Sequence, residues 1–196
     1  RILFVGGTPL YLRCLRDGLD ESPPVDIELR NSLANQIKCN GSEIVYEKLK
    51  SLRPDIAASI HPNDTKRIIR ALEIIELSGV NHKRSWTSAV NLEKQLFPCP
   101  ILVIDHPRKI INSRINERVE LMFESGILEE TEAAEQKSGI GKVAEQAAGY
   151  KESLAYIRGE MTKKEAVLKT QQRTRQLAKR QRTWFRSFPD AVWLSA

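Results

Sequence analysis

The stretch Pro98-Cys-Pro-Ile-Leu-Val-Ile-Asp105, followed at once by a helical pattern from Pro107 to Ser125, decides the fold class of this chain. A short, continuous apolar run rich in β-branched residues predicts a buried strand, and Gly126 is a typical end for the helix that follows. A strand that leads directly into a helix is the repeating unit of α/β proteins with parallel sheets. We therefore predict an α/β fold that is predominantly helical.

The start of the chain carries a second unit of this kind. Ile2–Val5 predicts a buried strand, Gly6-Gly7-Thr8 predicts a sharp turn, and a helix is expected to begin within Tyr11–Leu19. Such a turn places a hydroxyl and backbone amides at the carboxyl end of a strand, where open α/β sheets bind ligands. Because an apolar strand is already under way at Arg1, with no Met before it, we expect the chain to be a fragment of a longer protein.

The segment between these two units is helical in pattern. Glu21-Ser-Pro-Pro24 indicates a boundary, His61-Pro-Asn-Asp64 supplies a stop and an N-cap, and Gly79 ends the last helix. Helices are expected over residues 27–36, 42–52, 54–59 and 64–77. The predicted domains are a core segment (1–20), a helical insertion domain (21–97) and a core continuation that ends in a basic helix (98–196).

Three arginines on the predicted helices raise the question of their partners. Arg67 and Arg70 lie in the first turns of a helix, where the dipole does not favour a cation, so either an acid such as Glu73 or a phosphate would suit them. Arg118 falls within about 20–40° of the predicted buried stripe of its helix. A guanidinium on a packed side is costly unless it meets an anion, either an internal carboxylate or a bound phosphate. The predicted stripe consists of Ile111, Ile115 and Met122.

The most basic segment of the chain is 162–186, which holds nine Lys and Arg residues and one acid, Glu165, whereas the whole chain has a net charge of only +6. Thr162 and Glu165 predict a capping box, and neither Gly nor Pro interrupts the helix before Pro189. Because acids are nearly absent, pairing between successive turns cannot account for the charge, and we predict a polyanion-binding surface rather than a solvated charged face. One face of this helix is expected to present Lys164, Arg175, Lys179, Arg182 and Arg186, opposite Ala166, Thr170, Leu177, Gln181 and Trp184.

Composition excludes several other classes of protein. No apolar run reaches 18 residues, so we expect no membrane span. Three cysteines, odd in number and widely spaced, suit neither a disulfide framework nor a zinc site and favour the cytoplasm. The three histidines lack metal-ligand spacing, so no metal-binding residue is predicted.

Several motifs stand together in one order along the chain. They are Val5-Gly-Gly-Thr-x-Leu-Tyr11, Ile60-His-Pro-Asn-Asp64 with Arg67-Ile-Ile-Arg-Ala-Leu-Glu73, Arg114-Ile-x-x-Arg118, Ala148-Gly-Tyr-Lys-Glu152, and Thr174-Arg-Gln-Leu-Ala-Lys-Arg-Gln-x-Thr-Trp-Phe-Arg186. The ordered set resembles the tRNA dimethylallyltransferases, also called tRNA isopentenyltransferases, over essentially the whole chain. The resemblance implies a P-loop-like parallel-sheet core with a helical insertion, and transfer of a dimethylallyl group from dimethylallyl diphosphate to N6 of adenosine-37 in tRNA.

The family's early motifs are missing from this sequence. They are a Gly-rich phosphate loop, which implies nucleotide (ATP) binding, and an Asp-Ser segment that supplies the general base. The resemblance therefore implies the C-terminal two-thirds of such an enzyme, inactive as a fragment. The complete enzyme is expected to use Mg²⁺, with ligands mostly outside this chain, and to act as a cytoplasmic monomer on the tRNA anticodon stem-loop and dimethylallyl diphosphate, without a membrane partner.

The resemblance also assigns roles to individual residues. Thr8 matches a threonine beside the target adenosine, although Pro9 stands where Gly is commoner, and Arg118 matches an arginine associated with the substrate diphosphate. The residues that match tRNA-contacting positions are Arg30, Lys66, Arg67, Arg70, Gln146, Gly149, Tyr150, Lys151, Lys179, Arg180, Arg182 and Arg186. Two other functions stay open at this point: a non-enzymatic RNA-binding module, and a fragment of a P-loop nucleotide kinase.

Overall fold

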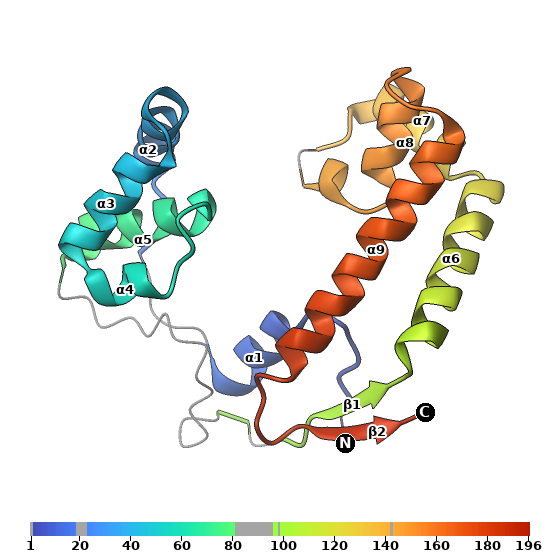
Figure 1. The fold of residues 1–196 in the computed structure, drawn as a ribbon, viewed down its shortest axis with the longest axis horizontal. Helices are drawn as coiled ribbons and strands as arrows, with labels where there is room; N and C mark the ends of the chain where they lie inside the picture. Colours follow the sequence, from blue (N-terminus) through green and yellow to red (C-terminus); the bar gives the residue numbers. More distant parts are fainter. Residues whose placement is uncertain (1, 19–22, 81–95, 98, 142) are drawn as a thin grey trace. The chain divides into compact units, whose positions relative to one another are not determined.

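The computed structural model of the chain describes residues 2–18, 23–80, 96–97, 99–141 and 143–196. These residues are mostly helical and contain two short parallel strands (Figure 1), which confirms the predicted fold class. The chain divides into two units, which we call the helical unit (Cys14–Leu96) and the sheet unit (Arg1–Arg13 with Phe97–Ala196). None of the described helices is long and apolar enough to cross a membrane.

The helical unit is built around the apolar side of α5. Asp26 and Asp64 cap α2 and α5, since their carboxylates accept the amides of Leu29 (2.9 Å) and Arg67 (3.2 Å). Its helices are α2 (Ile27–Asn40), α3 (Ser42–Leu52), α4 (Pro54–Ala58) and α5 (Thr65–Ser78), close to the predicted bounds. Buried side chains at helical spacing on α5, namely Ile68, Ala71, Leu72 and Ile75, pack with Leu33, Val45, Leu49, Ile56, Ala57 and Ile60.

The sheet unit places two long helices beside a parallel strand pair. In β1 (Leu102–Asp105) and β2 (Val192–Ser195), Leu102 lies opposite Val192 and Asp105 opposite Ser195. Helix α6 (Arg108–Glu124) begins directly after β1, and α9 (Lys163–Phe185) ends shortly before β2. The two helices run side by side (Figure 1), so residues far apart in sequence face one another across them.

The predicted capping box starts α9. Glu165 accepts the amide of Thr162 (2.8 Å), and the Thr162 hydroxyl accepts the amide of Glu165 (3.3 Å). Three shorter helices, α7 (Ile127–Ser138), η2 (Ala144–Gln146) and α8 (Tyr150–Ile157), connect α6 to α9, and α8 packs on both α7 and α9. The buried cluster of this unit consists of Val119, Phe123, Ile127 and Ala166.

The predicted strand at Ile2–Val5 is wrong. This segment is not a strand, and its four side chains are exposed. An apolar run becomes a strand only when a neighbour completes its hydrogen bonds, and the described strands, β1 and β2, pair with each other. The helix expected after the Gly-Gly-Thr turn is present as α1 (Pro9–Asp17).

Candidate nucleic-acid interface

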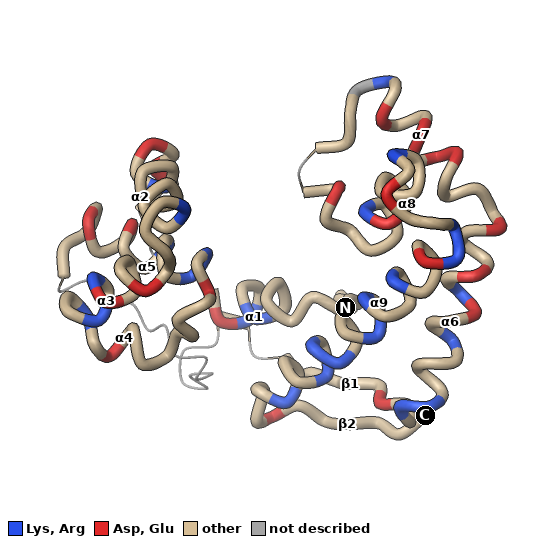
Figure 2. Tube along the Cα trace, turned by 45° about the horizontal axis from the view of Figure 1, so that its top comes forward, with Lys and Arg blue, Asp and Glu red and all other residues tan. Residues whose placement is uncertain are grey.

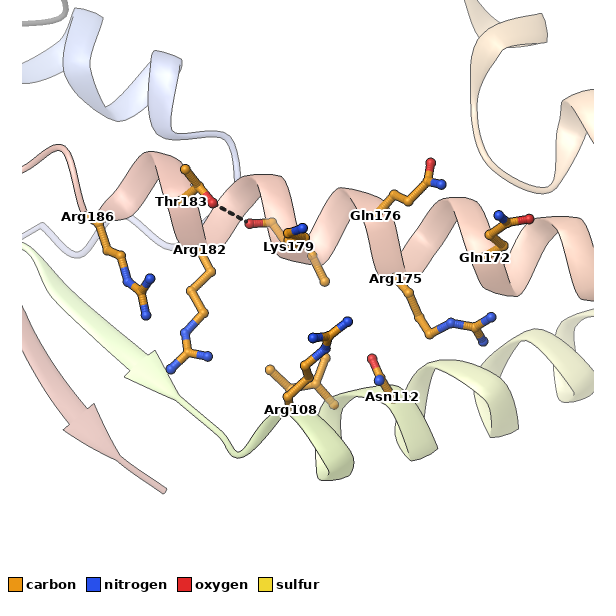
Figure 3. Close-up of a pocket in the computed structure, with 11 residues that line it drawn as sticks. Arg108, Asn112, Gln172, Arg175, Gln176, Lys179, Arg182, Thr183 and Arg186 are labelled. Carbon is orange, nitrogen blue, oxygen red and sulfur yellow. Dashed lines mark hydrogen bonds between the residues drawn. The ribbon is translucent and has the colours of Figure 1, made fainter.

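A basic pocket of about 510 Å³ lies between the first half of α6 and the second half of α9 (Figure 3). The described residues of its lining include five Lys and Arg side chains and no carboxylate: Arg108 from α6, Arg175, Lys179 and Arg182 from α9, and Arg186 directly after α9. Figure 3 shows Arg108 reaching from α6 towards α9, and Arg182 and Arg186 pointing away from the α9 backbone on the same side. Because like charges gather in one concave space, the pocket attracts anions.

Helical periodicity brings the four α9 cations to this pocket. Spacings of four, three and four residues from Arg175 to Arg186 place them on one face of the helix, as predicted. Figure 2 shows the basic residues distributed along α9. Lys179 and Arg180 are both exposed, but Arg180 does not line the pocket. The pocket and the neighbouring exposed cations together form a basic surface that extends beyond a single anion site.

Two of the pocket arginines are held by neighbouring polar groups. Arg182 Nη2 lies 2.6 Å from Oδ2 of Asp105, at the end of β1, and Arg175 Nη1 donates to Oδ1 of Asn116 at 2.5 Å. The buried Nε of Arg182 has no hydrogen-bond partner in the described part of the chain. Since the protein itself orients these guanidinium groups, less side-chain entropy is lost when an anion binds.

Arg108 and Arg175 were not among the predicted site residues. Arg175 belonged to the predicted basic face, so the signal for it was present in the spacing. Arg108 had no such signal, because it comes from another helix and joins the pocket only through the packing of α6 on α9. Its position at the start of α6 adds a cation where the helix dipole already favours anions.

The structure brings the predicted residue Thr8 beside α9. Thr8 is exposed, and the carbonyl of Gly7 accepts a hydrogen bond from Nε2 of Gln181 at 2.7 Å. A Cβ at Gly7 would lie 2.6 Å from that nitrogen, so any other residue at position 7 would force the Gln181 side chain to move. Next to this contact the guanidinium of Arg13 lies 6.0 Å from the ring centre of Trp184. Trp184 is therefore engaged within the protein, in agreement with its predicted place on the packing face of α9.

The prediction that Arg118 lies near the packed side of its helix is wrong. Arg118 is exposed, and the fully buried residues of α6 are Val119 and Phe123. At about 100° per residue, Val119 and Phe123 lie roughly 100° and 140° around the helix from Arg118, while Ile115 and Met122 of the predicted stripe pack against the same cluster, so the buried side is centred away from Arg118. In the described residues Arg118 has neither a hydrogen bond nor an ion pair, so the internal carboxylate, one of the two partners left open for it, is not found there. It remains a candidate only as an exposed cation available to an external anion.

The predicted contact segment 146–151 is held by hydrogen bonds from two sides. Arg173 of α9 donates to Oε1 of Glu152 (2.7 Å) and to the carbonyl of Gln146 (2.9 Å). Glu152 also accepts the amide of Gly149 (3.0 Å), at which φ is +101°. The Tyr150 hydroxyl donates to Glu130, and this hydrogen bond raises the pKa of Tyr150. Of the remaining predicted residues, Gln146 and Lys151 are exposed.

The helical unit holds the other four predicted contact residues. Lys66 is exposed on α5, and the neighbouring Arg67 pairs with Asp64 at 3.3 Å. Arg30 and Arg70 converge on a single carboxylate, that of Glu73. Of the two partners left open for Arg70, an acid such as Glu73 or a phosphate, the structure shows Glu73, and Arg30 joins it from α2.

Glu73 is a buried carboxylate with several donors. Its side chain is 0% exposed, and it accepts hydrogen bonds from Arg30, Arg70 and the amide of Asp26 (2.8 Å). Burial raises the pKa of Glu73, but the hydrogen bonds from Arg30 and Arg70 outweigh it, so the pKa lies below its ordinary value of 4.5. The ionised form is therefore stabilised in the folded protein. Its contribution to stability is complete above about pH 4.5 and is lost as the pH falls through the lower pKa of the folded state.

The expected Mg²⁺ ligands were placed mostly outside this chain. No group of three or more His, Cys, Asp or Glu side chains among the described residues could hold a metal ion. Asp105, beside the basic pocket, is paired with Arg182.

Comparisons with known proteins agree with this picture. The sequence profile described as "IPP transferase" matches residues 1–188. The tRNA dimethylallyltransferase 1 of Trichlorobacter lovleyi is 37% identical over 197 residues, which cover 100% of this chain and 64% of the relative. The tRNA dimethylallyltransferase of Myxococcus xanthus is 37% identical over 194 residues, covering 99% of this chain and 63% of the relative. The chain thus spans a little over three fifths of the length of these two relatives.

Solved structures share the fold over nearly the whole chain. The full-length tRNA isopentenylpyrophosphate transferase of Bacillus halodurans has a TM-score of 0.58 and 30% identity, covering 95% of this chain and 57% of that one. A eukaryotic dimethylallyltransferase acting on tRNA has a TM-score of 0.69 and 25% identity, covering 97% and 50%. Since the profile match, the curated relatives and the structural likeness all extend over this chain, it belongs to the IPP transferase family.

Proposed function

We propose that this chain is the tRNA-binding part of an enzyme that transfers a dimethylallyl group from dimethylallyl diphosphate to N6 of adenosine-37 in tRNA. The observation that carries the proposal is the acid-free pocket of five cations between α6 and α9, in a chain whose relatives are named tRNA dimethylallyltransferases. A folded RNA offers a dense array of phosphates, and cations that neutralise them dominate its affinity for protein. The anticodon stem-loop suits this surface, because its unpaired loop lets a base leave the stack without opening a duplex.

Residues of this chain support the reaction in distinct ways. In the transfer the allylic carbon–oxygen bond breaks, the adenosine amine attacks that carbon and loses a proton to a base, and diphosphate leaves. Arg118 is exposed and has no partner among the described residues, so it is suited to the charge of the diphosphate. Thr8 lies on the segment docked to α9 at Gln181, so the target adenosine would meet it at the edge of the basic surface.

Transfer itself tests the proposal. The longest reading frame that contains this chain should convert unmodified tRNA and labelled dimethylallyl diphosphate into tRNA that yields N6-dimethylallyladenosine on digestion to nucleosides. The chain of 196 residues, tested beside it, should bind the same tRNA. Binding by both proteins without any modified nucleoside would favour the non-enzymatic RNA-binding module, and absence of both activities would refute the proposal.

The basic surface of α9 allows a quantitative test of tRNA binding. Replacing Lys179 and Arg180 with alanine should weaken tRNA binding and reduce the slope of log affinity against log salt by about 1.4 to 1.8, because two phosphate contacts are lost. Both side chains are exposed, so the fold should not change. The matched control is the double replacement of Lys163 and Lys164, which removes the same charge from the other end of the same helix. Equal slopes for the two double variants would show that Lys179 and Arg180 do not contact tRNA.

A further inference from the structure

The two arginines that contact Glu73 differ in how many of their nitrogens donate inside the protein. Arg70 uses both of its terminal nitrogens inside the protein, donating from Nη1 to Glu73 and from Nη2 to the carbonyl of Pro23 at 3.0 Å. Arg30 uses one edge only, with Nε 3.0 Å from Oε1 and Nη2 2.9 Å from Oε2 of Glu73. The remaining nitrogen of Arg30, Nη1, has no hydrogen bond in the described residues.

The exposure of the side chains also distinguishes Arg30 from Arg70. The side chain of Glu73 is fully buried, that of Arg70 is 22% exposed and that of Arg30 is 38% exposed. A carboxylate that accepts two hydrogen bonds along the Nε–Nη2 edge of a guanidinium group fixes the plane of that group. Arg30 is therefore a surface cation of fixed orientation, whereas Arg70 completes the neutralisation of the buried carboxylate.

We infer that Glu73 is a positioning residue for RNA binding: it holds Arg30 by one edge so that Nη1 meets a phosphate oxygen of the tRNA, while Arg70 serves as the internal clamp. The inference rests on the proposed function, since it takes tRNA as the ligand. One carboxylate with two guanidinium groups has a net positive charge. Arg30, the more exposed of the two arginines, presents that charge at the surface. An arginine fixed in this way loses less entropy on binding than a free side chain.

A double-mutant cycle tests the coupling between Glu73 and Arg30. The probe is an RNA stem-loop with the sequence of a tRNA anticodon arm, and its affinity is measured for the wild-type chain, Glu73→Gln, Arg30→Ala and the double variant. Each single change should weaken binding by about fivefold to tenfold. The double variant should bind about as weakly as either single variant, and its loss should be well short of the product of the two single losses. Full multiplication of the two losses would overturn the inference, whereas failure of the wild-type chain to bind the RNA would overturn the proposed function itself.

Lysine at position 30 provides the variant that keeps the charge. Arg30→Lys cannot hold Glu73 along an edge and present a further donor to a phosphate, so it should bind as weakly as Arg30→Ala. Affinity equal to that of the wild type would mean that charge alone suffices, which contradicts a positioning role. This variant leaves Glu73 in place with Arg70, so it gives an answer even if Glu73→Gln does not fold.

A spectroscopic readout separates positioning from simple loss of stability. In the free protein the Nε–H of Arg30 should exchange slowly with water and give a distinct arginine resonance, which should disappear in Glu73→Gln. The matched control is Glu76→Gln on the same helix, which removes an exposed pair with Lys48 and should leave the Arg30 resonance unchanged. An Arg30 signal that survives in Glu73→Gln would refute the inference.

Discussion

Replacing Glu152 with alanine should lower the free energy of unfolding of the protein by about 3 kcal/mol, because a buried carboxylate with two kinds of partner is lost. The side chain of Glu152 is only 4% exposed, and it joins the amide of Gly149 to the guanidinium of Arg173. Without it the start of α8 loses its cap, and Arg173 keeps only the carbonyl of Gln146. Because Arg173 is 32% exposed, water restores part of its hydrogen bonding and limits the cost.

Urea denaturation followed by tryptophan fluorescence measures this change, and hydrogen exchange locates it. Exchange should accelerate at the amides of residues 146–157, while the core of the helical unit stays protected. The matched control is Arg158→Ala, which breaks two exposed ion pairs, to Glu135 and Glu145, next to the same helix and should have little effect. Equal stability of the two variants would mean that Glu152 does not hold this segment to α9.

Replacing Arg118 with alanine should reduce the rate of transfer by about 100-fold to 1,000-fold in the longest reading frame that contains this chain, while tRNA affinity stays nearly constant. An arginine beside the diphosphate stabilises charge that develops as the carbon–oxygen bond breaks, and this stabilisation is greatest in the transition state. The side chain is exposed and has no partner in the described residues, so its removal should not disturb the fold.

Single-turnover transfer and equilibrium tRNA binding, measured in parallel, distinguish the two effects of Arg118. Lys109→Ala is the matched control, because it removes an equal charge from the same helix at another exposed position. Unchanged transfer would refute the diphosphate role, and a loss of tRNA affinity as large as the loss of rate would assign Arg118 to tRNA binding instead.

Local patterns predicted the elements of this fold well. The carboxylate cap at Asp64 and the capping box of Thr162 and Glu165 act within one helical turn, so the sequence alone locates the starts of α5 and α9. Periodicity likewise placed four cations of α9 on one face, from Arg175 to Arg186, and the pocket confirms it. Each of these features depends on residues three or four positions apart.

Predictions that needed a distant partner were less successful. Ile2–Val5 has the composition of a strand, but a strand exists only where another segment pairs with it. The buried side of α6 was predicted too close to Arg118: Ile115 and Met122 of the predicted stripe do pack on the core cluster, but that side is centred nearer Val119 and Phe123, because what packs on a helix decides which of its residues lie inside. Arg118 therefore lies on the surface rather than near the packed side, and burial no longer gives a reason for it to bind an anion.

The sequence by itself determined the helices, the basic face of α9 and the family of the protein, since these depend on short-range spacing and on motifs in a fixed order. The tertiary structure alone decided that Arg108 completes a pocket with α9, that Arg173 holds Glu152, and that Glu73 is shared by Arg30 and Arg70. The physical reason is that a charged side chain gains a partner only through the packing of whole elements. Composition records how many charges there are, and packing decides which of them remain available to a ligand.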